Sequence, residues 1–554
     1  MLTTHSKART TPLLASRRKA PRNVRVLQRR GALTTALVLI VVLVFGAVLL
    51  SSPLAAAVAV IATTVGVAVL AWIWRAPVRG LYVLFGLAVM QETTYSGNVF
   101  SDDLGYYTPI FQDISTWTHI SGISFSVAEV FMLLVALIWL CKGIADRTLH
   151  FDRGVMMLPL GLYILMVGVA EAHGLSSGGD FKLSLWEVRA QAYMLITYIL
   201  ACNLVKTRAH LNTLLWIVVV GTGIKGVQGV WRYLITLHGS IHSVEALFPH
   251  EQSYFYNLFL TLALILPLYG GSKRLKRVTY FFLPFILIAS LANQRRAAIL
   301  AIAFALIGLL LITIAANPRR RRAGIAIVAL LLVVFPPYYL AFKDSTGLIG
   351  QPAHAISSNF TPDARDQSSN NYRINEDKDI LATMRLSPII GYGYGKKMAI
   401  DFPLYNISGA YVFWNLLPHD SILWVFMRTG LIGFFLLWVL IGTALVRAVE
   451  AVRRLDDAYL KGIAVFCILA IIQEIIFGYL DLQWTNYRNL IAIGVMFATI
   501  SRLFAFALAV APEQQQRAER RVLRAERLRG GVSLLDTAPV KAASAQRFAE
   551  KASS

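Results

Sequence analysis

The sequence has little charge for its length and few cysteines. Only 15% of its 554 residues are charged, whereas 56% are hydrophobic and the mean hydropathy is +0.59. A soluble domain needs charged side chains over most of its surface, so this composition excludes an ordinary soluble globular protein. Apolar runs of about 18 or more residues, long enough to cross a bilayer as a helix, recur along the chain. The sequence therefore predicts a polytopic membrane protein.

The three cysteines exclude a disulfide framework. Cys141, Cys202 and Cys467 all fall in apolar runs or at their ends, which also disfavours a thiolate metal site. Acidic residues are scarce as well: 30 Asp and Glu stand against 53 Lys and Arg, for a formal net charge of +23. In a soluble protein this excess would suggest nucleic acid. Here the basic residues gather in short loops on one side of the apolar runs, as the positive-inside rule requires, so we expect no nucleic-acid partner.

The apolar runs predict an all-α fold, a polytopic membrane helical bundle of about 12–14 transmembrane helices. The run that begins at residue 32 is too long for the apolar region of a cleaved signal and is interpreted as the first span. The third run is the shortest. Candidate spans lie at residues 32–50, 54–73, 80–91, 122–141, 155–171, 190–205, 210–230, 254–270, 278–294, 296–315, 323–342, 421–446, 461–480 and 489–509.

The basic clusters determine the predicted orientation. The first thirty residues are basic and contain no acid, which places the N-terminus in the cytoplasm. An even number of spans then puts the later basic clusters and the C-terminus on the same side. The predicted parts are a basic cytoplasmic arm (1–31), a first group of transmembrane helices (32–342), a large outer loop (343–420), C-terminal transmembrane helices (421–510) and a basic cytoplasmic tail (511–554).

The outer loop is unusually long. It begins with a polar run at 357–371, continues as a predicted short amphipathic helix around 374–384, and turns through Pro388 and the run Gly391-Tyr-Gly-Tyr-Gly395. Glycine lets the backbone fold tightly at such a turn. Loops of this length usually act as lids or binding loops, and a disordered spacer is the alternative.

Two arginines are candidates for anion binding. The sequence Asn293-Gln-Arg-Arg296 joins two apolar runs almost without a loop, so both guanidinium groups are fixed at the outer mouth of a tight hairpin. A guanidinium matches phosphate oxygens bidentately and stays charged, so Arg295 and Arg296 suit a pyrophosphate. The alternative is that both only anchor helix ends at the membrane surface. Basic residues are disfavoured on the outer side, which favours the functional interpretation.

A histidine ends the long loop, directly before the next span. His419 titrates near neutrality and is a candidate for taking a proton from a sugar hydroxyl, with Asp420 orienting it or capping the helix. The alternative is an interfacial polar residue. Arg189 and Arg373 are further candidate phosphate contacts. The outer segments also contain Lys182, Glu187, Arg232, His238, His242, His250, Glu251 and Arg365, without the spacing of a zinc site.

Two groups of charged residues, one within the apolar runs and one in the first long outer segment, leave two other functions open. Glu129, Lys225 and Glu474 lie where charge is costly, and a transporter of lipid-linked glycan, a flippase, would use such residues as a path for ions or protons. Asp102 and Asp103 could bind a divalent ion in a metal-dependent polyprenyl-phosphate sugar transferase. The competing interpretation of this acidic pair is a solvated turn.

Three passages follow one another between residues 290 and 433. The first, Ser290-Leu-Ala-Asn-Gln-Arg-Arg-Ala-Ala-Ile-Leu300, joins two apolar runs through arginine. The second combines Tyr372-Arg-Ile-Asn with the turn Leu386-Ser-Pro-Ile-Ile-Gly-Tyr-Gly-Tyr-Gly395. The third is His419-Asp-Ser-Ile-Leu-Trp-Val-Phe-Met-Arg-Thr-Gly-Leu-Ile-Gly433. In this order they resemble the bacterial O-antigen ligase and O-antigen polymerase superfamily of polytopic glycosyltransferases, in which Asn is commoner than Asp at position 420.

The resemblance implies a metal-independent, inverting glycosyltransferase without a cofactor in the bacterial inner (cytoplasmic) membrane. It would move a glycan from undecaprenyl pyrophosphate to an acceptor hydroxyl on the outer face, and so ligate or polymerise cell-surface polysaccharide such as lipopolysaccharide. The partners would be the undecaprenyl-pyrophosphate-linked donor, a glycan or lipid acceptor and membrane lipids. By position, Arg296 or Arg295 corresponds to the pyrophosphate arginine of the family, and His419 to the histidine that activates the acceptor. Arg189 is a weaker match to another basic residue of the site.

Overall fold

A computed structural model describes residues 53–92, 110–115, 125–240, 246–316, 321–345, 347–408 and 413–529. These residues form helices joined by turns and loops, and they contain no strand beyond an isolated bridge between Asp113 and Ser126. The predicted all-α class is therefore confirmed. The first predicted span, 32–50, and the acidic pair Asp102 and Asp103 lie outside the described residues.

A helix stands at the place of each predicted span from 54–73 onwards. Eight of the described helices are long and apolar enough to cross a membrane, which confirms a multi-pass membrane protein. The predicted short third span is a helix of 13 residues. The helices are α2 (Pro53–Arg75), α3 (Val78–Met90), α5 (Val127–Ala145), α6 (Met157–Ser176), α7 (Phe181–Leu204), α8 (Arg208–Trp231), α9 (His250–Tyr269), α10 (Lys273–Ala292), α11 (Arg296–Ala316), α12 (Arg321–Phe342), α15 (Ser421–Arg454), α16 (Ala458–Leu480) and α17 (Tyr487–Arg529).

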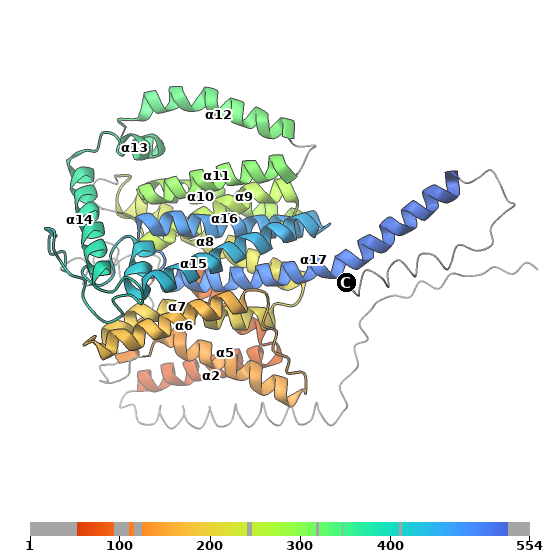
Figure 1. Ribbon diagram of the computed structural model, residues 1–554, viewed down its shortest axis with the longest axis horizontal. Coiled ribbons are helices and arrows are strands. Elements are labelled where there is room, and N and C mark those ends of the chain that lie inside the picture. The colour runs from red at the N-terminus through yellow and green to blue at the C-terminus, as the bar shows by residue number, and fades with distance from the viewer. Residues whose placement is uncertain are drawn as a thin grey trace, which may run out of the picture.

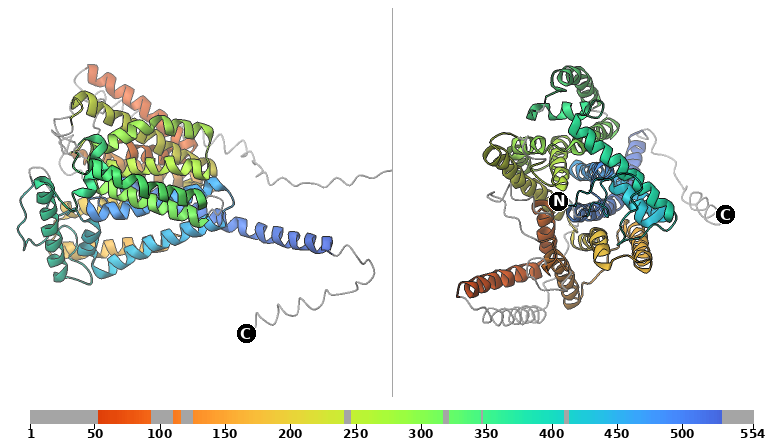
Figure 2. Two further views of the ribbon diagram at one scale, coloured as in Figure 1. Left: turned by 90° about the horizontal axis from the view of Figure 1, so that it is seen from above. Right: turned by 90° about the vertical axis from the view of Figure 1, so that its left-hand side faces the viewer.

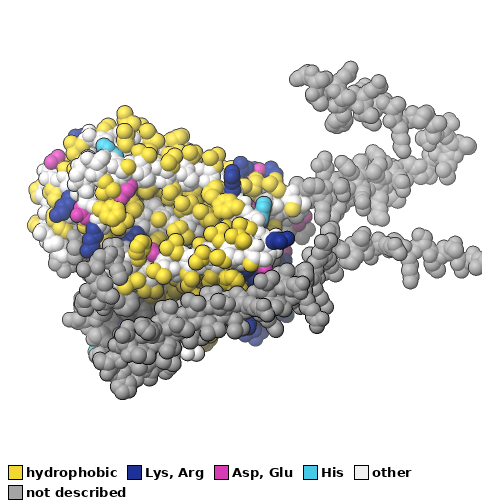
Figure 3. All heavy atoms as spheres, turned by 90° about the horizontal axis from the view of Figure 1, so that it is seen from below, with side chains coloured by type: hydrophobic (Ala, Val, Ile, Leu, Met, Phe, Trp, Pro, Cys, Tyr) yellow, Lys and Arg dark blue, Asp and Glu magenta, His cyan; other side chains and the backbone are white. Residues whose placement is uncertain are grey.

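The long helices lie side by side and form a bundle (Figure 1). In α16 and α17, 72% and 83% of the apolar stretch is buried, against 28% in α5 and in α10, so α16 and α17 form the centre. One flank of the molecule is mostly hydrophobic along its length, with Lys and Arg side chains gathered towards its ends (Figure 3). This distribution fits a bundle whose sides face lipid and whose ends face water.

Two helices between α12 and α15 lie at one end of the bundle. They are α13 (Gln351–Ser357) and α14 (Ala364–Leu386), and α14 runs across the ends of the long helices (Figure 2). The predicted short helix around 374–384 thus begins earlier, within the run predicted to be polar loop. The Asp363 side chain fixes this start because it accepts a hydrogen bond from the Asp366 backbone N at 2.7 Å. The helix ends before Pro388, where proline disfavours a further turn.

A buried ion pair holds the glycine-rich turn that follows α14. Gly393 in this turn has a φ of +85°, a left-handed conformation that favours glycine. Arg428 Nε of α15 lies 2.6 Å from Glu187 Oε1 of α7, and both side chains are fully buried. Arg428 also donates hydrogen bonds to the carbonyl oxygens of Gly393 (3.0 Å) and Leu416 (2.9 Å). It thereby ties both ends of the segment that leads into α15 to the bundle.

Candidate active site

The turn between α10 and α11 presents two arginines at the α14 end of the bundle. Asn293 ends α10, and Gln294 has a φ of +53°, so the chain reverses before α11 begins at Arg296. The Asn293 side chain is buried and donates a hydrogen bond to Ser253 Oγ of α9 at 2.8 Å. The hairpin is therefore fixed to α9, and the positions of Arg295 and Arg296 follow from it.

A cavity of about 790 Å³ lies at this hairpin and is lined also by α13 and α14. Its volume is in the range of small-molecule sites. Four predicted site residues line it: Arg295, Arg296, Arg373 and His419. The other lining residues are Gln294, Ala297, Ile299, Gln351, His354, Ala355, Asp363, Asp366, Ser368, Ser369, Tyr372, Tyr405, Ile407 and Asp481. The structure thus brings together basic residues and a histidine that lie far apart in the sequence.

Polar contacts orient two of the arginines. Arg296 Nη1 lies 3.3 Å from Ser358 Oγ and 3.2 Å from Asp366 Oδ2. Its Nη2 donates to Asn370 Oδ1 at 3.2 Å. The side chain remains 25% exposed, so a ligand in the cavity can reach it. Arg373 of α14 donates a hydrogen bond at 2.8 Å to the last backbone carbonyl of α16.

A buried carboxylate holds His419. Glu376 of α14 accepts a hydrogen bond from the His419 backbone N at 2.9 Å, and the same Oε2 lies 3.0 Å from the imidazole Nδ1. Tyr372 packs edge-on against the imidazole, with ring centroids 5.9 Å apart. The His419 side chain is 18% exposed and lines the cavity. It is both oriented and accessible, as a general base must be.

Asp481 brings a further carboxylate to the cavity. It directly follows α16 and pairs with His250 at the start of α9. Burial alone raises the pKa of this carboxyl. The charges of His250, Arg373 and Arg295 outweigh burial and hold the pKa of Asp481 well below its usual range. Asp481 therefore stays ionised and offsets part of the positive charge in the cavity.

Two more carboxyl groups near His419 hold their protons more tightly than usual. Burial raises the pKa of Asp377 to about 6, and the neighbouring Glu376 acts in the same direction. Burial also raises the pKa of Asp420 to about 7, with further contributions from Asp377 and Glu376. The Asp420 side chain accepts hydrogen bonds from two backbone N–H groups in the first turn of α15, at 3.0 and 2.8 Å. Of the two roles considered for Asp420, the structure shows the helix cap, and Glu376 holds the imidazole.

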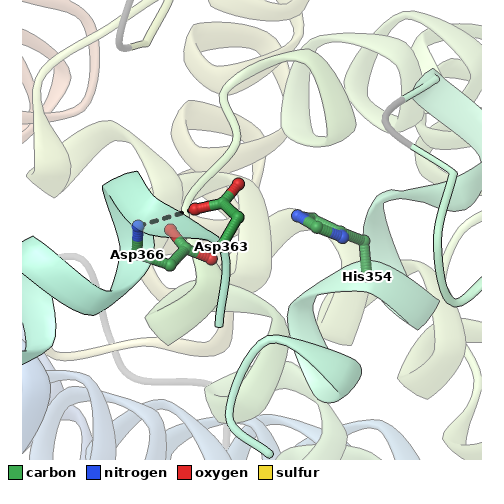
Figure 4. Close-up of side chains that lie close together, drawn as sticks. All are labelled: His354, Asp363 and Asp366. Atoms are coloured by element: carbon green, nitrogen blue, oxygen red, sulfur yellow. Dashed lines mark hydrogen bonds between the residues drawn. The ribbon is translucent and has the colours of Figure 1, made fainter. Parts of the chain in front are cut away.

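His354, Asp363 and Asp366 form a candidate set of metal ligands in the same cavity (Figure 4). One ligand atom from each lies within 4.8 Å of the others. The His354 Nδ1 is buried and has no hydrogen-bond partner in the described part of the chain. Both aspartates have other roles, because Asp363 caps α14 and Asp366 pairs with Arg296. These contacts already offset part of their charge.

Arg189 does not line the cavity. Its side chain is 5% exposed, with Nη1 2.6 Å from Asp113 Oδ1 and Nε 3.2 Å from Glu129 Oε1. These ion pairs join α7 to the first turn of α5 and to the segment 110–115 that precedes it. The geometry therefore gives no support to the prediction that Arg189 contacts a pyrophosphate in this cavity.

The charged residues within the apolar runs have partners inside the bundle. Lys225 Nζ lies 2.6 Å from Glu92 Oε1, and Glu474 accepts a hydrogen bond from Asn489 Nδ2 at 3.0 Å. Glu129 closes a capping box at the start of α5. These contacts connect helices or satisfy a helix end. They do not by themselves indicate a continuous path for ions.

Glu376, Asp481 and Tyr372 are site residues that the sequence did not reveal. Glu376 lies 43 positions from His419, and Asp481 lies after the last of the three sequence passages, which ends at residue 433. One signal was available, because Glu376 lies three residues after Arg373 and therefore on the same helix face. A helix assigned across this whole stretch predicts that both point to the same side.

Comparison with known proteins supports one family. Residues 279–438 match a family model described as O-Antigen ligase. The matched part runs from α10 into α15 and contains the hairpin arginines, all of α14 and His419. The resemblance carried by the three sequence passages is confirmed. A comparison with curated proteins finds no match.

Proposed function

Since residues 279–438 are O-antigen ligase-like, we propose that the protein is an inverting glycosyltransferase that moves a glycan from undecaprenyl pyrophosphate to an acceptor hydroxyl. The reaction takes place on the outer face of the bacterial cytoplasmic membrane and ligates or polymerises cell-surface polysaccharide. In this orientation both termini lie in the cytoplasm, and α14 with its cavity faces outward. The partners are the lipid-linked donor, a glycan or lipid acceptor and the surrounding lipids.

One observation carries the proposal: three arginines and an accessible, carboxylate-bound histidine line a single cavity at one end of a membrane bundle. Guanidinium groups suit a pyrophosphate leaving group because they stay charged and match its oxygens geometrically. In a partly dry site, such preorganised cations lower the barrier by several kcal/mol. The histidine supplies the base that an acceptor hydroxyl requires.

In the proposed reaction the arginines bind the pyrophosphate while its bond to the sugar C1 breaks. Arg295, Arg296 and Arg373 stabilise the negative charge that develops on the leaving group. His419 Nε2 takes the proton of the acceptor hydroxyl, and the acceptor oxygen bonds to C1 from the opposite face. The configuration at C1 is inverted, and undecaprenyl pyrophosphate leaves with the bonding electron pair. The mechanism uses no covalent intermediate with the protein.

The test is release of undecaprenyl pyrophosphate from a lipid-linked oligosaccharide by the reconstituted protein in the presence of EDTA. We expect release by the wild type, and rates at least about 100-fold lower for Arg296→Ala and His419→Ala. Arg385→Ala is the matched control, because Arg385 is an exposed residue of α14 that does not line the cavity. It should retain the wild-type rate.

Two outcomes would contradict parts of the proposal. Equal rates for wild type, Arg296→Ala and His419→Ala, or no release with a range of donors and acceptors, would remove the transferase assignment and favour transport. Release that EDTA abolishes and a divalent ion restores would overturn metal independence. In that case Asp363→Asn would test whether the candidate metal ligands bind the ion.

A further inference from the structure

We propose that Glu376 is a positioning residue that fixes His419 so that Nε2 is the atom that takes the acceptor proton. The inference rests on the proposed function, in which His419 is the general base. Glu376 acts through His419 and not on the substrate, because its own side chain is 1% exposed and does not line the cavity.

The carboxylate of Glu376 holds His419 at two points. Its Oε2 accepts the hydrogen bond from the His419 backbone N at 2.9 Å and lies 3.0 Å from Nδ1, while Oε1 lies 3.3 Å from Nδ1. The main chain and the ring are therefore fixed by the same group. The edge of the Tyr372 ring, at a centroid distance of 5.9 Å, restricts rotation of the imidazole further.

The contact also selects the tautomer. An ionised carboxylate only accepts hydrogen bonds, so the imidazole nitrogen beside Glu376 is the one that carries a proton. The neutral ring then has its lone pair on Nε2. After proton transfer the imidazolium is stabilised by the adjacent negative charge. Without the carboxylate, the acceptor beside Nδ1 that fixes the ring orientation and the tautomer is lost.

Other charged groups surround this pair. Asp377 follows Glu376 on α14, Arg373 lies one turn before it, and Asp420 follows His419 in the chain. Of these carboxyl groups, Glu376 is the one in contact with the imidazole. The variants that test the proposal keep Asp377, Arg373 and Asp420. The charge of Glu376 raises the pKa of Asp377 and of Asp420, so Glu376→Gln lowers both pKa values, and a variant that keeps the charge must be compared over the same pH range.

The test compares kcat, the KM for donor and the pH profile of kcat/KM between wild type and Glu376→Gln. We expect kcat to fall about 10- to 100-fold while KM changes less than about threefold. The acid limb of the profile should move to lower pH, because the imidazolium loses the adjacent negative charge. Glu450→Gln is the matched control, since Glu450 pairs with Arg447 and Arg454 at the far end of α15. It should behave as wild type.

A second variant keeps the test informative if Glu376→Gln does not fold. Glu376→Asp keeps the charge on a shorter side chain, so we expect a smaller loss of kcat and an acid limb at the wild-type position. If Glu376→Gln cannot be purified in folded form, a fall in kcat for Glu376→Asp with an unmoved limb supports the proposal. Wild-type kcat for Glu376→Asp would overturn it.

His419→Ala separates failure of this inference from failure of the proposed function. If His419→Ala is inactive but Glu376→Gln matches the wild type in kcat and in its acid limb, Glu376 does not position the base and the base assignment stands. If His419→Ala is as active as the wild type, the proposed function itself is wrong.

Discussion

At Arg296 the protein supplies several polar partners for one guanidinium group. Ser358, Asp366 and Asn370 lie 3.2–3.3 Å from its Nη atoms, so the planar fork has a defined orientation. Lysine would keep the charge but would lose the fork and most of these contacts. The geometry of the side chain, and not its charge alone, is therefore expected to matter for the donor.

We expect Arg296→Lys to lower kcat/KM for the donor by at least about tenfold, equivalent to about 1.4 kcal/mol. The measurement is the rate of undecaprenyl pyrophosphate release at subsaturating donor. Arg385→Lys serves as the control because Arg385 is exposed on the same helix, away from the cavity. Equal values for Arg296→Lys and the wild type would show that a point charge is sufficient.

The buried carboxyl group of Asp420 is expected to make the stability of the protein depend on pH. Burial raises the pKa of Asp420 to about 7, above the value of about 3.9 in an unfolded chain. The stabilising contribution of such a group is complete below the unfolded pKa and is lost as the pH rises through the folded pKa. Asparagine keeps an acceptor for the helix cap without the charge.

Asp420→Asn should therefore raise the unfolding temperature of the detergent-solubilised protein at pH 8, and the gain should shrink towards pH 5. Thermal unfolding followed by tryptophan fluorescence at several pH values measures it. A gain that is the same at every pH would point to the cap geometry and not to the buried charge.

Among the elements, α6 and the glycine-rich turn approach each other very closely. A Cβ atom added at Gly174 of α6 would lie 2.2 Å from the Tyr394 carbonyl oxygen, whereas one added at Gly168 of the same helix would meet nothing within 4 Å. The turn leads through the segment held by Arg428 to His419. A displaced turn is therefore expected to disturb the site as well as the fold.

We expect Gly174→Ala to destabilise the protein by about 1–3 kcal/mol and to lower the rate of donor turnover. Gly168→Ala should stay within about 0.5 kcal/mol of the wild type. Thermal unfolding and the release assay measure the two effects. Similar behaviour of both variants would show that α6 and the turn can separate at little cost.

The elements differ in how far the sequence predicts them. The hairpin at Asn293 to Arg296 is predictable because its signal is local: polar residues between two apolar runs. The first half of α14 is not, since the run at 357–371 is polar and has no apolar periodicity. Its helix depends on the Asp363 cap and on contacts with the bundle end.

The residues of the candidate site also differ in how far the sequence predicts them. Arg295, Arg296 and His419 are predictable because they stand beside apolar runs in recognisable passages. Glu376 gains its role only when α14 meets the segment before α15, and Asp481 only when the end of α16 meets α9. A single sequence does not encode these contacts locally. Arg189 shows the limit of a local signal: its position before a predicted span suggests a site, whereas its ion pair with Asp113 depends on tertiary structure.

For the whole molecule, the proposed orientation places α14 outside the cell membrane. We expect a cysteine introduced by Gln367→Cys on α14 to react with a membrane-impermeant maleimide on spheroplasts. One introduced by Asp456→Cys, after the far end of α15, should react only after lysis. Both positions are exposed, and Cys141, Cys202 and Cys467 would first be replaced. The reverse pattern would invert the topology and remove the access of the cavity to outer-leaflet acceptors.

The arrangement of α14 constrains how the sequence of the protein can diverge. Asp366, Asn370, Arg373 and Glu376 recur every three or four residues and so rise along one face of one helix. This face contacts Arg296 at one end and His419 at the other. A chimaera that takes residues 364–386 from a relative should therefore keep the contacts with Arg296 and with His419 together or lose both. New acceptor preferences should arise in segments outside this helix.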